Sequence, residues 1–257
     1  MKVTRMKNLF CCGLLIGGGV LPSVVSATPS THVWTPSTDI QADKTFHITT
    51  DFYIPSEKDA TGSKPDNVTN LGLEGGLWPI KEKLGVEAGF DVINGYGQLD
   101  NYPLYFNAKV GTPEGSLFQY SPALAFGGYY FGTENNKTNQ NVIYVKGAET
   151  LTLGDFNVGR FSVGWFWGNE DVLLDQNGDS DADGVMLTWE RTMSEISDKL
   201  WLCVDYQGSD SGLGSLSPGV AWKFADNVSM ILGYDIPNNE DLAETFTVQV
   251  DVDFGIK

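Results

Sequence analysis

Apolar and polar residues alternate along most of this chain, and the longest alternation is at its C-terminal end. Residues 246–257 read FTVQVDVDFGIK, with Phe, Val or Ile at every second position. Successive side chains of a β-strand point to opposite faces, so this segment predicts a strand with one apolar and one polar face. Strands of soluble sandwiches are usually about five or six residues long. A longer alternating strand is typical of a barrel that crosses a membrane.

The same alternation recurs in segments of about ten residues from Phe46 onward, separated by turn-forming residues. No window of a dozen residues sustains the three- and four-residue apolar spacing of a helix, which indicates an all-β chain. The second, fifth and sixth of the expected strands have the weakest patterns. The expected strands cover residues 46–54, 68–77, 84–93, 102–111, 117–131, 141–150, 159–168, 185–193, 199–207, 215–224, 228–236 and 245–256.

The predicted connections alternate in length. Those after odd-numbered strands, such as SEKDATGSKPDN, are longer and rich in Asn, Asp and Gly, whereas those after even-numbered strands, such as TPEGS, are mostly short. This alternation is typical of up-and-down outer-membrane barrels. The sequence therefore predicts a closed antiparallel up-and-down transmembrane β-barrel of about 12 strands over residues 45–257, with the last strand paired to the first near Phe46. An even strand count places the N- and C-termini on one side, which we expect to be periplasmic.

The N-terminus combines Lys2, Arg5 and Lys7 with an apolar run over residues 9–21 and small residues before position 28. This is the pattern of a secretory signal peptide, and the apolar run is too short to span a bilayer. We expect residues 1–27 to be removed on export.

Residues 28–44 are polar and contain proline, which predicts an irregular N-terminal arm in which Trp34 and Ile40 pack against the barrel. The formal net charge is −17, and removal of the three signal-peptide cations lowers it to −20. This charge argues against nucleic acid as a partner. Without the signal peptide only Cys203 remains, so no intrachain disulfide is expected.

Three segments carry a resemblance to known proteins: VWTPSTDIQ, LYFNAKVGTPEGSLFQYSPALAFGGY and RTMSEISDKLW. With the overall pattern, they make the chain similar to Gram-negative outer-membrane β-barrels, porin-like in general character, and to a family of bacterial barrel proteins. The resemblance implies a location in the outer membrane, with outer-membrane lipid as the surrounding partner. It covers the mature chain and brings no established catalytic motif.

If the apolar phase faces lipid, the other phase lines the interior. Acidic residues outnumber basic ones about two to one there, which predicts a narrow diffusion channel for ions or small hydrophilic solutes with a weak preference for cations. The alternative is a structural or adhesive surface barrel whose interior charges pair and fill it, and whose outer loops bind a partner or calcium. The expected lumen residues are His47, Asp51, Glu87, Asp91, Lys109, Lys146, Arg160, Glu190, Asp205, Lys223, Asp235, Asp251 and Asp253.

The fourth long connection contains DQNGDSDADG followed by a strand that includes Glu190. The spacing of alternate aspartates, a glycine and a glutamate matches a calcium-binding loop. However, the flanks predict strands rather than helices, and Glu190 would lie well inside one of them. A solvated acidic surface loop is one alternative. The other is a shorter calcium site formed by Asp175, Asn177, Asp179, Asp181 and Asp183.

No enzymatic activity is expected. The only histidines are His32, in the arm, and His47, at the start of the first strand. The chain has no GxSxG, HExxH, glycine-rich phosphate loop or paired CxxC motif, so no catalytic residue and no cofactor other than calcium is expected.

Overall fold

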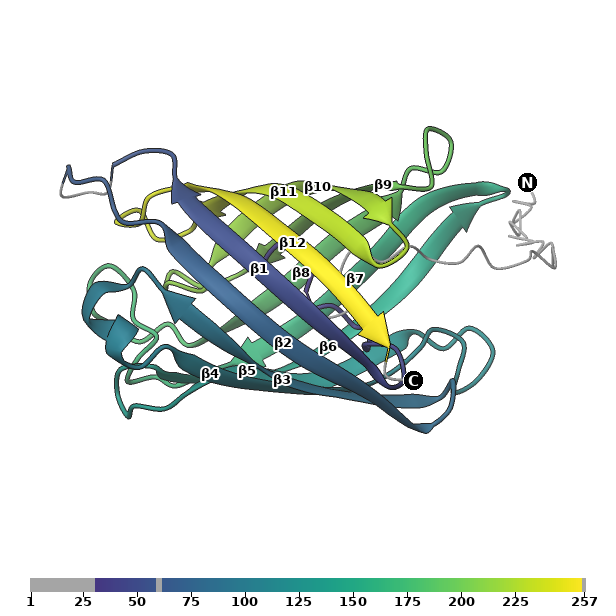
Figure 1. Cartoon of the computed structure of the whole chain (residues 1–257), viewed down its shortest axis with the longest axis horizontal. Coiled ribbons are helices and arrows are strands. Elements are labelled where there is room, and N and C mark those ends of the chain that lie inside the picture. The colour runs from purple at the N-terminus through teal and green to yellow at the C-terminus, as the bar shows by residue number, and fades with distance from the viewer. Residues whose placement is uncertain (1–30, 59–61, 256–257) are drawn as a thin grey trace, which may run out of the picture.

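Twelve antiparallel strands form a closed barrel in the computed structural model, which describes residues 31–58 and 62–255 (Figure 1). The predicted signal peptide, residues 1–27, lies outside the described residues. Each strand pairs with its neighbours in the chain, which confirms the predicted closed antiparallel barrel. The strands are β1 (Thr45–Pro55), β2 (Val68–Ile80), β3 (Leu84–Asn94), β4 (Leu104–Thr112), β5 (Ala123–Gly132), β6 (Asn139–Leu153), β7 (Phe156–Trp167), β8 (Asp183–Thr192), β9 (Leu200–Gln207), β10 (Ser215–Ala225), β11 (Val228–Pro237) and β12 (Thr245–Gly255).

The last strand closes the barrel against the first, as the alternation at the chain end predicts. The pairing runs without a bulge from Thr45 opposite Gly255 to Pro55 opposite Thr245. In Figure 1 these two strands, β1 in dark blue and β12 in yellow, cross the front of the barrel side by side and tilted. This pairing leaves neither strand with an open edge.

The two ends of the barrel differ in their connections. At one end, called the loop end here, the strands are joined by residues 56–67, 95–103, 133–138, 168–182, 208–214 and 238–244. The connection between β3 and β4 contains the short 3₁₀-helix η1 (Gly97–Asn101). At the other end, called the turn end, the connections are residues 81–83, 113–122, 154–155, 193–199 and 226–227. No helix in the described part of the chain is long and apolar enough to cross a membrane.

The fifth strand is shorter than the predicted residues 117–131. Residues 113–122 instead form a loop at the turn end, in which Gly115 N donates a hydrogen bond to Ser121 O over 2.8 Å. Pro122 ends this loop and has no N–H to contribute to a strand ladder. The connection between β4 and β5 is therefore longer than the short turn that the sequence predicts.

The outer face of the barrel is apolar on every strand. Side chains of the predicted apolar phase lie outward, and on every strand at least one of them is between 37% and 60% exposed. Among them are Phe52, Leu71, Phe90, Phe106, Phe126, Val145, Val163, Leu187, Val204, Val220, Leu232 and Phe246. We call this band the apolar belt; it covers far more apolar surface than a soluble monomer normally exposes.

The closing register can be tested by cross-linking. Ile48 lies directly opposite Val252, so Ile48→Cys/Val252→Cys in a Cys203→Ser background is expected to form a disulfide on mild oxidation, because opposed Cα atoms in antiparallel strands lie within bonding range. Non-reducing gel mobility measures the product. Ile48→Cys/Val248→Cys, offset by roughly 13 Å along the strand, is the matched control. Equal cross-linking of both pairs would contradict the register.

Candidate functional site in the barrel interior

Residues 31–44, called the inner segment below, lie inside the barrel. The described part of the predicted arm therefore lies in the space that the barrel encloses, against the inner face of the wall. Most side chains of residues 32–41 are buried, whereas Thr31 and residues 42–44 are exposed. His32, Val33, Thr35, Ser37, Thr38 and Gln41 are each at most 3% exposed. The interior is thus occupied by a part of the chain that the sequence leaves without a defined place.

Asp205 on β9 holds the innermost turn of this segment. His32 N donates to Thr35 O over 2.8 Å, which closes a tight turn. The Asp205 Oδ2 atom accepts the backbone N–H groups of Trp34 at 3.0 Å and Thr35 at 2.8 Å, and the Thr35 hydroxyl at 3.1 Å. Hydrogen bonds to a buried carboxylate are stronger than those between neutral groups. Asp205 therefore fixes the position at which the segment turns.

Lys146 on β6 binds the same turn from the opposite side. Its ammonium donates to Thr35 Oγ1 at 2.9 Å, Pro36 O at 2.8 Å and Thr188 Oγ1 at 2.8 Å, and the side chain is 1% exposed. A buried ammonium needs all three of its hydrogens bonded. Two of these three bonds go to the inner segment, so the segment supplies hydrogen-bond acceptors for the Lys146 ammonium that the wall alone does not provide.

Arg160 on β7 is a second cationic anchor. Its guanidinium donates to the Asp39 carboxylate over 2.8 Å and to Thr38 Oγ1 over 2.7 Å. Glu190 lies 3.6 Å from Arg160 and accepts bonds from the ring nitrogens of Trp201, at 3.0 Å, and of His32, at 3.2 Å. Charges of the wall and of the segment thus alternate across this contact.

Toward the turn end, the segment is bound by wall residues on β3 and β12. Gln41 N donates to Glu87 over 2.7 Å, and Glu87 pairs with Lys109 at 3.3 Å. The Gln41 amide donates to Asp253 over 2.9 Å, and His47 lies 2.9 Å from the same carboxylate. The whole length of the inner segment is therefore anchored to interior charges.

Val33 packs against the wall where two glycines face the interior. It forms a buried cluster with Trp201, Cys203, Ala221 and Ile231. A Cβ atom would lie 2.5 Å from Val33 at Gly219 and 2.6 Å from it at Gly233. These glycines are therefore the places where the wall makes room for Val33. Gly76 and Gly85 likewise face Gln41 and Ile40 of the segment. Such strand glycines are a signal in the sequence for the inner segment, but by themselves they indicate only relief of crowding in a curved sheet.

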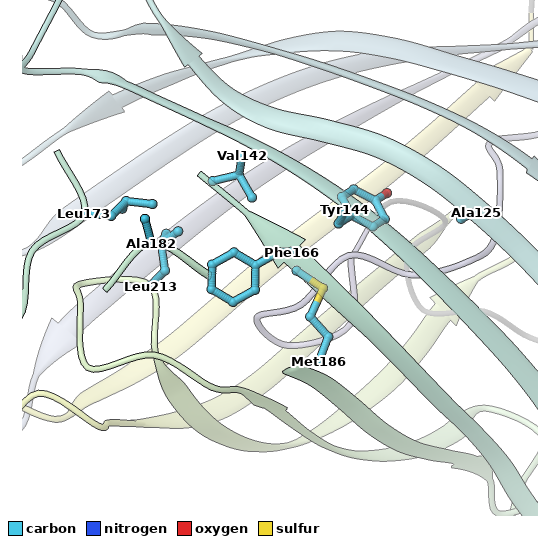
Figure 2. Packing of buried hydrophobic residues seen from close by; sticks show 8 residues of the cluster. All are labelled: Ala125, Val142, Tyr144, Phe166, Leu173, Ala182, Met186 and Leu213. Atoms are coloured by element: carbon cyan, nitrogen blue, oxygen red, sulfur yellow. The ribbon is translucent and has the colours of Figure 1, made fainter. Parts of the chain in front are cut away.

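An apolar cluster fills the loop end beside β5 to β8. Figure 2 shows Phe166 at its centre, with Val142 and Met186 from neighbouring strands and with Leu173 and Leu213 from the connections. The Trp34 indole donates to Leu213 O over 2.8 Å, which joins the inner segment to this cluster. This side of the interior is therefore packed rather than open.

A cavity of about 100 Å³ remains between the inner segment and the wall of β1 to β6. Tyr129 on β5 bounds it and accepts a hydrogen bond from Gln207 on β9 over 3.0 Å, which bridges opposite sides of the barrel. At about 30 Å³ per water in the liquid, the cavity holds a few water molecules. The charged residues that line it are His47, Asp51, Glu74, Glu87, Asp91, Lys109 and Asp251.

The chain is similar to solved structures of outer-membrane channels and porins, whereas no protein-family model and no curated protein matches it. An outer membrane channel from Pseudomonas putida is similar at 14% identity and a TM-score of 0.46, with 91% of this chain and 99% of that one covered. The KdgM porin is similar at 9% identity and a TM-score of 0.48, with 82% and 99% covered. The Acinetobacter baumannii outer membrane protein Omp33 is similar at 8% identity and a TM-score of 0.45, with 82% and 99% covered.

The structure places the expected lumen residues on the strands, most of them in the interior. Arg160 and Asp253 bind the inner segment, and Asp91 lines the cavity. Lys223, near the turn end of β10, is half-exposed and lies 3.8 Å from Asp226. Fully buried are His47, Asp51, Glu87, Lys109, Lys146, Glu190, Asp205, Asp235 and Asp251. Several aromatic residues of the loop end, such as Tyr105 and Tyr129, also lie inward.

The acidic loop after β7 closes on itself. Asp175 accepts hydrogen bonds from the backbone N–H groups of Asn177 and Asp179 and from the Asn177 amide. These hydrogen bonds hold the pKa of Asp175 below its ordinary value, and the bond from the Asn177 side chain contributes most. Glu190 is buried in β8, away from this loop. No group of three or more His, Cys, Asp or Glu side chains in residues 31–58 and 62–255 is arranged to hold a metal. Calcium binding at Asp175, Asn177, Asp179, Asp181 and Asp183 stays a prediction.

The fit between Val33 and the glycines gives a testable outcome. In Gly233→Ala the new Cβ would overlap Val33, so we expect the inner segment to dock about 1–3 kcal/mol less tightly, the usual range for overpacking. Limited proteolysis read by mass spectrometry should then cleave residues 31–44 faster. Val33→Ala/Gly233→Ala should recover part of the protection. Gly147→Ala, whose Cβ would lie 3.5 Å from Leu124, is the control. Equal cleavage of Gly233→Ala and Gly147→Ala would contradict the close fit.

Proposed function

We propose that the protein is an outer-membrane barrel that passes small ions, with a preference for cations, through an interior narrowed by its own inner segment. The apolar belt carries the membrane part of this proposal. Every strand contributes outward apolar side chains to it, and a closed barrel satisfies all of its backbone hydrogen bonds without water. The long connections of the loop end then lie outside the cell, and the termini lie in the periplasm.

The cavity beside β1 to β6 supports the proposal that ions pass through the barrel. It is polar, it is bounded by the wall on one side and the inner segment on the other, and most of its charged residues are acidic. An acid-lined space within a low-dielectric wall raises the local concentration of cations. At about 100 Å³, it suits small ions with a few waters; passage of small hydrophilic solutes such as sugars requires the inner segment to move.

A plugged structural barrel is the second candidate, and the buried anchors of the inner segment favour it. Lys146 and Asp205 are each 1% exposed and direct most of their hydrogen bonds to residues 34–36. A segment held by so many buried polar bonds stabilises the barrel whether or not ions pass. Conductance with the segment locked and released separates the two candidates.

The lock uses the native Cys203. Val33 and Cys203 belong to one buried cluster, so Val33→Cys is expected to form a disulfide that holds the segment inside. In planar bilayers we expect the oxidised protein to show small, cation-preferring steps. In a variant lacking residues 31–44, conductance should rise by at least about twofold, since twelve strands enclose more space than the eight that side chains alone fill. After reduction, the segment stays docked by Asp205 and Lys146, and conductance should equal that of the intact protein.

Val33→Cys/Cys203→Ser, which cannot lock, is the control, and thiol labelling reports disulfide formation. A silent intact protein with a conducting deletion variant would favour the plugged barrel over the channel. No conductance in any variant would overturn the channel, and a preference for anions in the intact protein would overturn the stated selectivity.

The membrane position can be tested on the apolar belt. Leu232→Lys places a charge at the middle of the outer face of β11, and near the bilayer midplane this should lower the free energy of unfolding in lipid vesicles by about 2–4 kcal/mol. Leu242→Lys, on the connection of residues 238–244, is the control because Leu242 is similarly exposed, at 44% against 46% for Leu232. Denaturant titration in vesicles measures both. Equal effects of the two substitutions would argue against a lipid-facing belt.

A further inference from the structure

Four polar side chains form a row across the cavity wall, one on each of the first four strands. We call Asp51, Asn70, Asp91 and Asn107 the Asp-Asn row. The Asn70 amide nitrogen donates to Asp51 Oδ2 and to Asp91 Oδ1, both over 3.0 Å, and the Asn107 amide donates to Asp91 Oδ2 over 2.9 Å. All four residues line the cavity. The row thus presents two carboxylates to the same space, held apart by one amide.

The side chains that donate hydrogen bonds to the two carboxylates of the row are all neutral. Among the residues that the structure describes, neither Asp51 nor Asp91 forms an ion pair. The side chains that donate hydrogen bonds to them are the two amides of the row and the Thr49 hydroxyl, which donates to Asp51 over 2.6 Å. Neutral donors orient a carboxylate but leave its net charge in place.

Other acidic groups of the cavity differ in this respect. Glu87 pairs with Lys109 at 3.3 Å, and Asp251 lies 3.3 Å from the His47 ring. Each of these carboxylates therefore has a basic side chain beside it. The carboxylates of the Asp-Asn row differ from Glu87 and Asp251 in having only neutral donors beside them.

The wall is shaped to hold this row. A Cβ atom at Gly72 would lie 2.8 Å from Asp91 Oδ1 and 2.7 Å from the Thr49 methyl group, so only glycine lets these side chains lie across β2. Charged groups held by their neighbours act on a ligand without reorganising. The row is therefore a fixed feature of the wall rather than two mobile surface acids.

We infer that the Asp-Asn row is the specificity-determining surface of the barrel, and that Asp51 and Asp91 set the preference of the passage for small monovalent cations. This inference rests on the proposed channel function. A cation moving along the cavity meets two carboxylate charges separated by the width of one amide. The cavity is too small for an anion to pass at a distance from these charges, so an anion is repelled.

The test is the reversal potential of the intact protein in planar bilayers under a potassium chloride gradient. Asp51→Asn/Asp91→Asn removes both charges and keeps the side-chain shape, and the new amides can donate to Asn70 Oδ1, which has no partner in the described structure. We expect the ratio of cation to anion permeability to fall by at least about twofold, because the charges that raise the local concentration of cations are removed. Each single variant should give an intermediate ratio.

Asp171→Asn/Asp241→Asn is the matched control, because it removes the same net charge from the exposed connections of the loop end. Gel migration without boiling, compared with boiled samples, checks that each variant forms the barrel. If Asp51→Asn/Asp91→Asn conducts with an unchanged permeability ratio, the row does not set selectivity. The same conclusion follows if the control changes the ratio equally. Neither result would contradict the proposed channel function. Absence of current in the intact protein and in every variant would overturn both the role of the row and the proposed channel.

Discussion

A closed strand ladder directs every second side chain into an enclosed space, and the polar groups in that space need partners. This constraint governs the rest of the molecule. The interior of this barrel carries fixed carboxylates and cations on nearly every strand, and a buried charge without partners is strongly unfavourable. Twelve strands enclose too much space for the wall side chains to satisfy each other across it. The inner segment meets this need, because its backbone N–H and C=O groups reach Asp205 and Lys146 near the middle of the barrel.

The inner segment also explains why the two sides of the interior differ. On the side of β6 to β9, the segment and the apolar cluster around Phe166 fill the space. On the side of β1 to β6, a cavity remains between the segment and the wall. The segment and the apolar cluster therefore divide the interior into a filled side and a side with a cavity. In the proposed channel, a solute would meet the residues of the second side.

Alternation along the chain predicts most of the barrel because strand periodicity is a local property. The phase of FTVQVDVDFGIK is enough to predict closure against the first strand, and the inward position of residues such as Asp51 follows from the same counting. The start of β5 is missed, since the turn before Pro122 interrupts a pattern that still alternates. The path of the inner segment is a different kind of property. Its contacts join residues such as Trp34 and Asp205, which are 171 positions apart, and they use backbone groups that no side-chain pattern reveals.

Gly219 and Gly233 mark the position of the inner segment, but glycines also occur on strands at bulges and at tight bends of a barrel wall, where no second segment approaches. The Asp-Asn row is missed for a related reason. The sequence places Asp51 and Asp91 in the lumen, but which carboxylates have a cationic partner depends on the paired strands.

The inner segment therefore controls charge as well as width. Arg160 and Lys146 are the cations of the filled side, and the segment covers both, with Asp39 adding a carboxylate against Arg160. If the segment left, these two cations would face the lumen directly, and the interior would become wider and more nearly neutral at once. In the proposed channel, high selectivity for cations and a wide passage would therefore exclude each other. The balance between them depends on how firmly Asp205 holds two backbone N–H groups.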